Sequence, residues 1–252
     1  MNNIIKKLVD KTVSYKFIPL MYQIFSRIGM SSRSHFQATL NDLVVRMSVD
    51  HPYHTLPQLF ALANEDQVGD YQGGAQYKNN LSSERISTAN KVLQRIRSAA
   101  KLVNLVQSTT DLLGSYNRLA RASTIELQKR TQCRNISFKE IQPRGCTFVD
   151  ETNSIISVYR PFVITATPIV RKDANYEAHV VRIDYFNERF SITDSGVSRP
   201  KIIECRGDDG LVYRQLVKGG DDMRQDAVMQ QVILGNAFLM SSGVSQERFS
   251  HR

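Results

Sequence analysis

The hydrophobic pattern of the chain changes its period near residue 130, and this change limits the folds that are open to it. Residues 33–50 carry apolar side chains at the spacing of one helical face, and these are Phe36, Leu40, Leu43, Val44 and Met47. From Cys133 onward, β-branched and aromatic residues dominate short runs that turn signals separate, which is typical of antiparallel strands. The pattern predicts an α+β fold in which a helical segment precedes a sheet.

The first half is expected to form helices that pack as antiparallel pairs. Residues 16–29 and 55–65 show helical spacing, and residues 67–83 have the Gly, Asn and Ser content of a loop. Beyond that loop, one long helix is expected from about Ala89 to Val103, and another from about Leu112 to Ala120.

The second half is expected to form a sheet followed by one helix. The strand-like runs are residues 161–170, 177–186, 189–193, 200–207 and 211–218. The glycines and aspartates of residues 207–210 predict a hairpin between the last two runs. A helix is expected from Asp221 to about Met240, and a polar tail follows it.

Charge and composition exclude few functions. The formal net charge is +9, but the cations are spread along the chain without interleaved aromatic residues, so a solvated face is favoured over direct nucleic-acid binding. Three cysteines without metal-type spacing favour reduced thiols inside the cell. No apolar run approaches the roughly 20 residues that span a membrane.

His51 and His54 lie three residues apart with no third ligand nearby, so a polar corner between helices is favoured over a metal site.

The stretch KGGDDMRQD, residues 218–226, joins the last strand to the last helix. Side chains alternate along a strand, so Val212, Arg214, Leu216 and Lys218 are expected on one face. Taken alone, the acids of this stretch would suit a capped helix with a surface lysine nearby. The order of the elements upstream favours a nucleotide site over a surface turn. A strand, a short Ser/Gly loop, a hairpin and then a strand that ends in a lysine resemble the nucleotide-binding half of a protein kinase.

Residues 195–232 are similar to the amino-terminal kinase lobe of the phosphatidylinositol-3-kinase-related protein kinases. The string of lysine, glycine, paired acids and Arg-Gln-Asp is shared with lipid kinases, whereas PKIIECRGDDG and AVMQQV are most similar to the ataxia-telangiectasia-mutated (ATM) branch. Residues 13–64 resemble the end of the FAT domain, the helical solenoid beside the kinase. The resemblance covers 13–64 and 190–234, and it implies FAT helices over 1–130 and a kinase amino-terminal lobe with its αC-type helix over 131–252.

The resemblance implies an ATP site. Ser195, Gly196 and Val197 would form the loop over the phosphates, although Asp-Ser-Gly stands at 194–196 where the family has paired glycines. Leu216 would line the adenine pocket, and Lys218 would contact the phosphates.

Two acids complete the site that the resemblance implies. Asp221 and Asp226 would lie near Lys218. The family's catalytic loop, Asp-Phe-Gly metal motif and FATC segment do not occur in these residues, so we expect no catalytic residue and no metal ligand here, and no phosphoryl transfer by the chain alone. ATP and Mg²⁺ would be cofactors of a complete enzyme, with the metal ligands in the missing carboxy-terminal lobe.

The family implies a nuclear, and also cytoplasmic, serine/threonine protein kinase of DNA double-strand-break signalling, repair and checkpoint control. Its substrates would be proteins with Ser/Thr-Gln sites, its partners DNA-break sensor complexes, and its full-length form a homodimer without membrane contact. Two alternatives stay open on the residues: a non-catalytic helical interaction module with an attached sheet, and a fragment of a phosphatidylinositol lipid kinase. Loss of nucleotide binding on Lys218→Ala would distinguish a kinase lobe from the interaction module.

Overall fold

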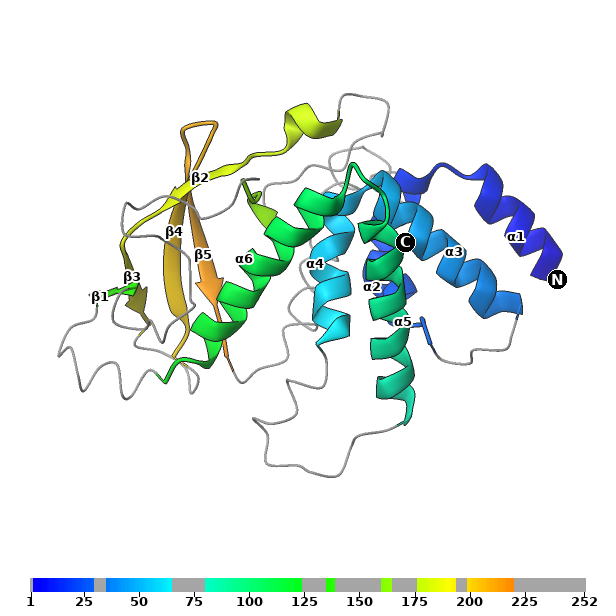
Figure 1. Ribbon diagram of the computed structural model, residues 1–252, viewed down its shortest axis with the longest axis horizontal. Helices are drawn as coiled ribbons and strands as arrows, with labels where there is room; N and C mark the ends of the chain where they lie inside the picture. Colours follow the sequence, from blue (N-terminus) through cyan, green and yellow to red (C-terminus); the bar gives the residue numbers. More distant parts are fainter. Residues whose placement is uncertain are drawn as a thin grey trace, which may run out of the picture. The chain divides into compact units, whose positions relative to one another are not determined.

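The computed structural model describes residues 2–29, 35–64, 80–123, 135–138, 160–164, 176–193 and 199–219 (Figure 1). The chain divides into two compact units, residues 1–220 and 221–252, and all described residues belong to the first. These residues form a helical part followed by an antiparallel sheet, so the predicted α+β class is confirmed.

The helical part contains six α-helices and one 3-10 helix within the described residues. They are α1 Asn2–Lys11, the 3-10 helix η1 Ser14–Leu20, α2 Met21–Phe25, α3 His35–Asp50, α4 Pro52–Ala63, α5 Asn80–Arg97 and α6 Val103–Arg121. Pro52 starts α4 because its fixed φ suits a first helical turn and its missing N–H has no partner to lose there. The prediction that this helix begins at residue 55 was therefore wrong by three residues.

Two further helix predictions were wrong at their boundaries. The loop was expected to extend to residue 83, but α5 begins at Asn80. The single helix expected from Ala89 to Val103 ends at Arg97, and Val103 is the first residue of α6. Turns close this break through backbone bonds such as Leu102 N–H to the Ala99 carbonyl, at 2.8 Å. Apolar spacing continued across the turn, so periodicity alone did not reveal it.

The sheet has five strands within the described residues. They are β1 Asn135–Ser137, β2 Ile183–Phe186, β3 Arg189–Ile192, β4 Lys201–Gly207 and β5 Val212–Val217, and a 3-10 helix, η4 Tyr176–His179, precedes β2. One edge of β4 pairs with β3 and then with β2, its other edge pairs with β5, and β1 pairs with β3, all antiparallel. The strand expected over 177–186 is therefore shorter, since its first residues form η4.

The expected hairpin at residues 207–210 is present. Gly210 has a φ of 80°, a left-handed conformation that glycine adopts at little cost. Gly207 N–H donates to the Leu211 carbonyl at 2.9 Å, which closes the turn between β4 and β5. Of the run 161–170, only 161–164 are described, and there Phe162 forms a single bridge to Arg182.

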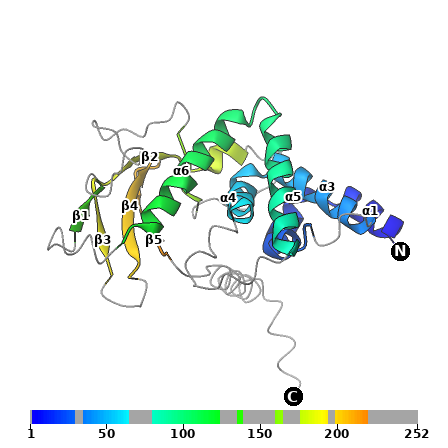
Figure 2. The same ribbon diagram turned by 60° about the horizontal axis from the view of Figure 1, so that its bottom comes forward.

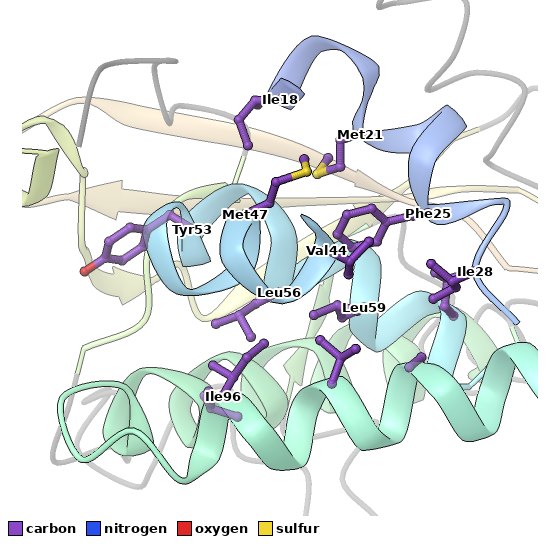
Figure 3. Packing of buried hydrophobic residues seen from close by; sticks show 14 of the residues in the cluster. Ile18, Met21, Phe25, Ile28, Val44, Met47, Tyr53, Leu56, Leu59 and Ile96 are labelled. Carbon is purple, nitrogen blue, oxygen red and sulfur yellow. The ribbon is translucent and has the colours of Figure 1, made fainter. Parts of the chain in front are cut away.

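Two hydrophobic cores stabilise the first unit. One gathers the helices, and Figure 3 shows some of its residues, among them Met21, Phe25, Val44 and Met47. The other lies between the sheet and α6 and includes Ile136, Phe186, Phe190, Ile203 and Val217. Each such side chain contributes about 1.5–3 kcal/mol when fully buried. Helix α6 serves both cores, with Leu105 and Val106 in the first and Leu112 and Leu119 in the second.

Candidate functional site

The sheet has an inner face toward α6 and an outer face that is less buried. Figures 1 and 2 both show α6 running alongside β5, and the Tyr116 hydroxyl on α6 donates to the Gln215 side chain on β5. Burial raises the pKa of that hydroxyl well above its ordinary value. The residues of β5 therefore alternate between α6 and the outer face, as strand geometry requires.

Four residues in register form one row across the outer face. Asn135 pairs with Ser191, Ser191 with Ile202, and Ile202 with Leu216. Leu216 is 55 % exposed and Ile202 is half-buried. The row thus ends in two neighbouring apolar side chains on β4 and β5. Apolar area of this kind suits the face of a planar ring.

Polar groups border this apolar surface. A hollow of about 480 Å³ on β1, β3 and β4 is lined in part by Ser191, Ile202 and Glu204. The Glu204 carboxylate accepts a hydrogen bond from Asn187 Nδ2 at 2.8 Å and lies 3.3 Å from Arg214 Nε. The outer face therefore offers both apolar area and fixed charge.

Lys218 directly follows β5, two residues beyond Leu216, and it is half-buried. Val212, Arg214 and Leu216 are all exposed, which agrees with the expectation that they share one face of β5. Val217, on the opposite face of the strand, is buried. Leu216 and Lys218 are the two predicted site residues that the structure describes. Ser195, Gly196, Val197, Asp221 and Asp226 lie outside the described residues.

Sequence reasoning missed one buried cation beside this site. Lys201 is only 2 % exposed and occupies the inner face at the start of β4. Its ammonium donates to the carbonyl oxygen of Ala120, in the last turn of α6, at 3.1 Å. Burial lowers the pKa of Lys201 to about 8. The signal was available, because Lys201 shares its strand face with Ile203 and Cys205 in the alternating run 200–207.

His51 lies in a polar corner between the end of α3 and the start of α4. His51 is buried, and its Nε2 lies 3.1 Å from Ser14 Oγ, which also donates to Asp50 at 2.8 Å. Within the described ranges, no group of three or more His, Cys, Asp or Glu side chains could hold a metal ion. No helix of those ranges is both long enough and apolar enough to cross a membrane.

Comparison with known proteins identifies the relatives of this chain. No family model matches the sequence. It is 35 % identical to the serine-protein kinase ATM of Sus scrofa over 98 % of the chain, and 35 % identical to the serine/threonine-protein kinase ATM of Arabidopsis thaliana over 92 %. The serine/threonine-protein kinase tel1 of Schizosaccharomyces pombe is 31 % identical over 98 % of the chain. The chain belongs to the ATM/Tel1 kinases.

Solved structures agree with this assignment. The FAT and kinase domain of CtTel1 superposes on 92 % of the chain with a TM-score of 0.71 and 29 % identity, and the open conformation of CtTel1 gives 0.72 and 30 %. The chain covers 8 % of the ATM of Sus scrofa and 15 % of the FAT and kinase domain structure. It therefore corresponds to a small segment of an ATM/Tel1 kinase.

Proposed function

We propose that this segment supplies the ATP-phosphate-binding half of a serine/threonine protein kinase. The observation that carries the proposal is the outer face of the sheet, where the exposed Leu216 and the neighbouring Ile202 lead directly to Lys218. A purine ring would pack on the apolar pair, and the lysine would neutralise phosphate charge. The relationship to kinases named ATM and tel1 supports this reading.

The remaining site residues are part of the same proposal. Ser195, Gly196 and Val197 connect β3 to β4, so they would cover the phosphates with a loop. Asp221 and Asp226 follow Lys218 closely and would orient its ammonium. Their carboxylates are the chemical type that holds a lysine by a charge-assisted hydrogen bond.

A kinase also needs a divalent metal and a catalytic base. The described residues fit the nucleotide, because they hold an apolar surface and a cation, but they contain no acidic cluster for a metal. From the family resemblance we place the Mg²⁺ ligands and the catalytic Asp in the carboxy-terminal lobe of the complete kinase, and we propose that phosphoryl transfer needs that lobe as well as this segment. Mg²⁺ would supply positive charge that neutralises the negative charge of the phosphates during transfer.

We assign residues 1–130 to the end of the FAT domain and residues 131–252 to the kinase amino-terminal lobe. The end of α6 at Arg121 and the start of β1 at Asn135 lie on either side of this boundary. The lipid-kinase and helical-module alternatives are not favoured, since the relatives are protein kinases that match both the helices and the sheet.

The wider role follows from the family. Protein substrates are expected for a serine/threonine kinase. We further propose Ser/Thr-Gln sites as targets, a nuclear location, action in DNA-break signalling with break-sensor complexes, and a homodimeric full-length enzyme. Phosphorylation of a Ser-Gln peptide, and not of its Ser-Ala counterpart, by the intact kinase would test the substrate proposal.

The test of the site is a titration of the chain with MgATP, followed by the fluorescence of a labelled ATP analogue. Lys218→Ala is expected to weaken binding about tenfold or more, because a hydrogen bond to a charged group contributes about 1.5–3 kcal/mol. Arg206→Ala is the matched control, since Arg206 is an exposed cation at the opposite end of the β4–β5 pair. Equal affinities for the wild-type chain and Lys218→Ala would contradict the proposal.

A further inference from the structure

Lys201 stands in an apolar row of the inner face. Its register neighbours are Ile192 on β3 and Val217 on β5, and both are buried. A lysine is almost never fully buried unless its charge is paired, and burying a charge costs free energy that an apolar side chain would not. Packing alone therefore does not account for a lysine at this position.

The partner of Lys201 is the end of a helix. The carbonyl of Ala120 lies in the last turn of α6, where carbonyls lack intrahelical partners and carry the negative end of the helix dipole. The Lys201 ammonium satisfies one of these oxygens from inside the core. Because a neutral amine also donates, the contact persists when burial lowers the pKa of the group.

The same carbonyl lies against the chain just beyond Lys218. A Cβ atom on Gly219 would overlap the Ala120 carbonyl oxygen, so the backbone of Gly219 packs directly on the end of α6. On the other side of Lys218, Val217 pairs in register with Lys201. Both neighbours of Lys218 are thus held at one place, which we call the Ala120 junction and define as Lys201, Ala120 and Gly219.

We propose that Lys201 is a positioning residue for nucleotide binding, which fixes the end of β5 against the α6 carboxy-terminus and thereby sets where Lys218 reaches. This inference rests on the proposed function of Lys218 as the phosphate-binding cation. Lys201 itself faces the core and touches no nucleotide. The junction also ties the nucleotide lysine to α6, the helix that continues into the helical core.

The test compares Lys201→Met, Lys201→Arg and the wild-type chain in two measurements. Methionine preserves an apolar inner face, and replacing a buried charge with a well-packed apolar group is often neutral for stability. Lys201→Met is expected to fold, to bind MgATP about tenfold more weakly, and to exchange the backbone amide hydrogens of residues 216–219 faster. Lys201→Arg keeps a donor for the Ala120 carbonyl and is expected to restore most of both properties.

Ile136→Val is the matched control. Ile136 is fully buried on the same inner face but lies on β1, away from the Ala120 junction. It is expected to lower the denaturant concentration at the midpoint of unfolding, while ATP affinity and amide exchange at residues 216–219 stay unchanged.

The outcomes separate this inference from the function on which it rests. If Lys218→Ala weakens ATP binding but Lys201→Met does not, the positioning role is wrong and the nucleotide site stands. If Lys218→Ala binds ATP like the wild type, the nucleotide site is wrong. Amide exchange at 216–219 that is unchanged in Lys201→Met overturns the positioning role whatever the binding result.

Discussion

At the residue scale, Lys201 shows how one side chain links burial to pH. Its ammonium is enclosed by the sheet–helix core and bonded to a helix end, and its pKa falls from an ordinary 10.5 to about 8. Desolvation disfavours the charged form of the amine, so the pKa of Lys201 falls. The protonation of Lys201 is therefore coupled to folding.

We predict that the stability contribution of Lys201 changes between pH 8 and pH 10.5. In this window the unfolded chain holds a proton that the folded chain has released, so this group makes the free energy of unfolding rise with pH. The stability of the wild-type chain minus that of Lys201→Met should thus increase from pH 8 to 10.5. Denaturant unfolding of both chains at several pH values measures the difference.

Other groups that titrate in this range are common to both chains. Burial raises the pKa of Cys205 to about 11, so its thiol stabilises the fold below pH 9 and that contribution is lost as pH rises through 11. Taking the difference between the two chains removes such effects. A difference that stays constant across the window would show that the pKa of Lys201 is not lowered.

At the element scale, close backbone contacts define how the helices pack. Gly29 follows α2 with a φ of 74°, and a Cβ atom there would lie 2.9 Å from the Arg85 backbone nitrogen of α5. Both the left-handed conformation and the contact require glycine. The turn after α2 therefore packs on the backbone of a helix far along the chain.

We predict that Gly29→Ala lowers the free energy of unfolding by about 2–5 kcal/mol. Left-handed strain accounts for about 1–2 kcal/mol, and overpacking against α5 for about 1–3 kcal/mol. Gly210→Ala is the control, because Gly210 also has a positive φ but its Cβ would meet only the end of the Arg206 side chain, at 3.9 Å. It should lose only the strain. Equal losses, by urea denaturation, would exclude the close contact.

The sequence predicted these elements where a single physical rule decided them. The alternation of β5 and the glycine of the 207–210 turn identified the hairpin. Two helices were predicted here, but the first was extended to Val103 instead of ending at Arg97, because apolar spacing continued through a turn that tertiary packing determines. Leu216 and Lys218 were proposed as site residues from a motif. The alternation of residues 200–207 could have placed Lys201 on the apolar strand face, but not predicted its role, since that role depends on a contact with Ala120, 81 residues away.

At the scale of the whole molecule, α6 connects the helical core to the sheet. Its first half packs with the helices and its second half with the strands. A second contact crosses the same boundary, where Arg182 donates to the Tyr53 hydroxyl at 2.9 Å and the rings of Tyr53 and Phe162 lie 5.0 Å apart. The proposed domain boundary near residue 130 therefore divides the sequence, but the helices before it and the sheet after it pack against each other.

This continuity gives the nucleotide proposal a physical basis. The proposed site lies on the sheet, the sheet packs against the second half of α6, and the first half of α6 packs among the other helices. A site supported by rigid elements keeps its cation in place before the ligand arrives. ATP binding should therefore depend on Lys218 directly and on the sheet–α6 contact indirectly.

The most direct measurement is covalent labelling of the chain with an acyl-phosphate derivative of ATP, which acylates a lysine that lies beside the bound phosphates. Mass spectrometry of the digested protein then gives the modified lysine. We predict that Lys218 carries the label and that excess MgATP suppresses it, while exposed lysines such as Lys91 are labelled weakly and without competition. Labelling of Lys218 that excess MgATP leaves unchanged, or competed labelling at another lysine alone, would contradict the account.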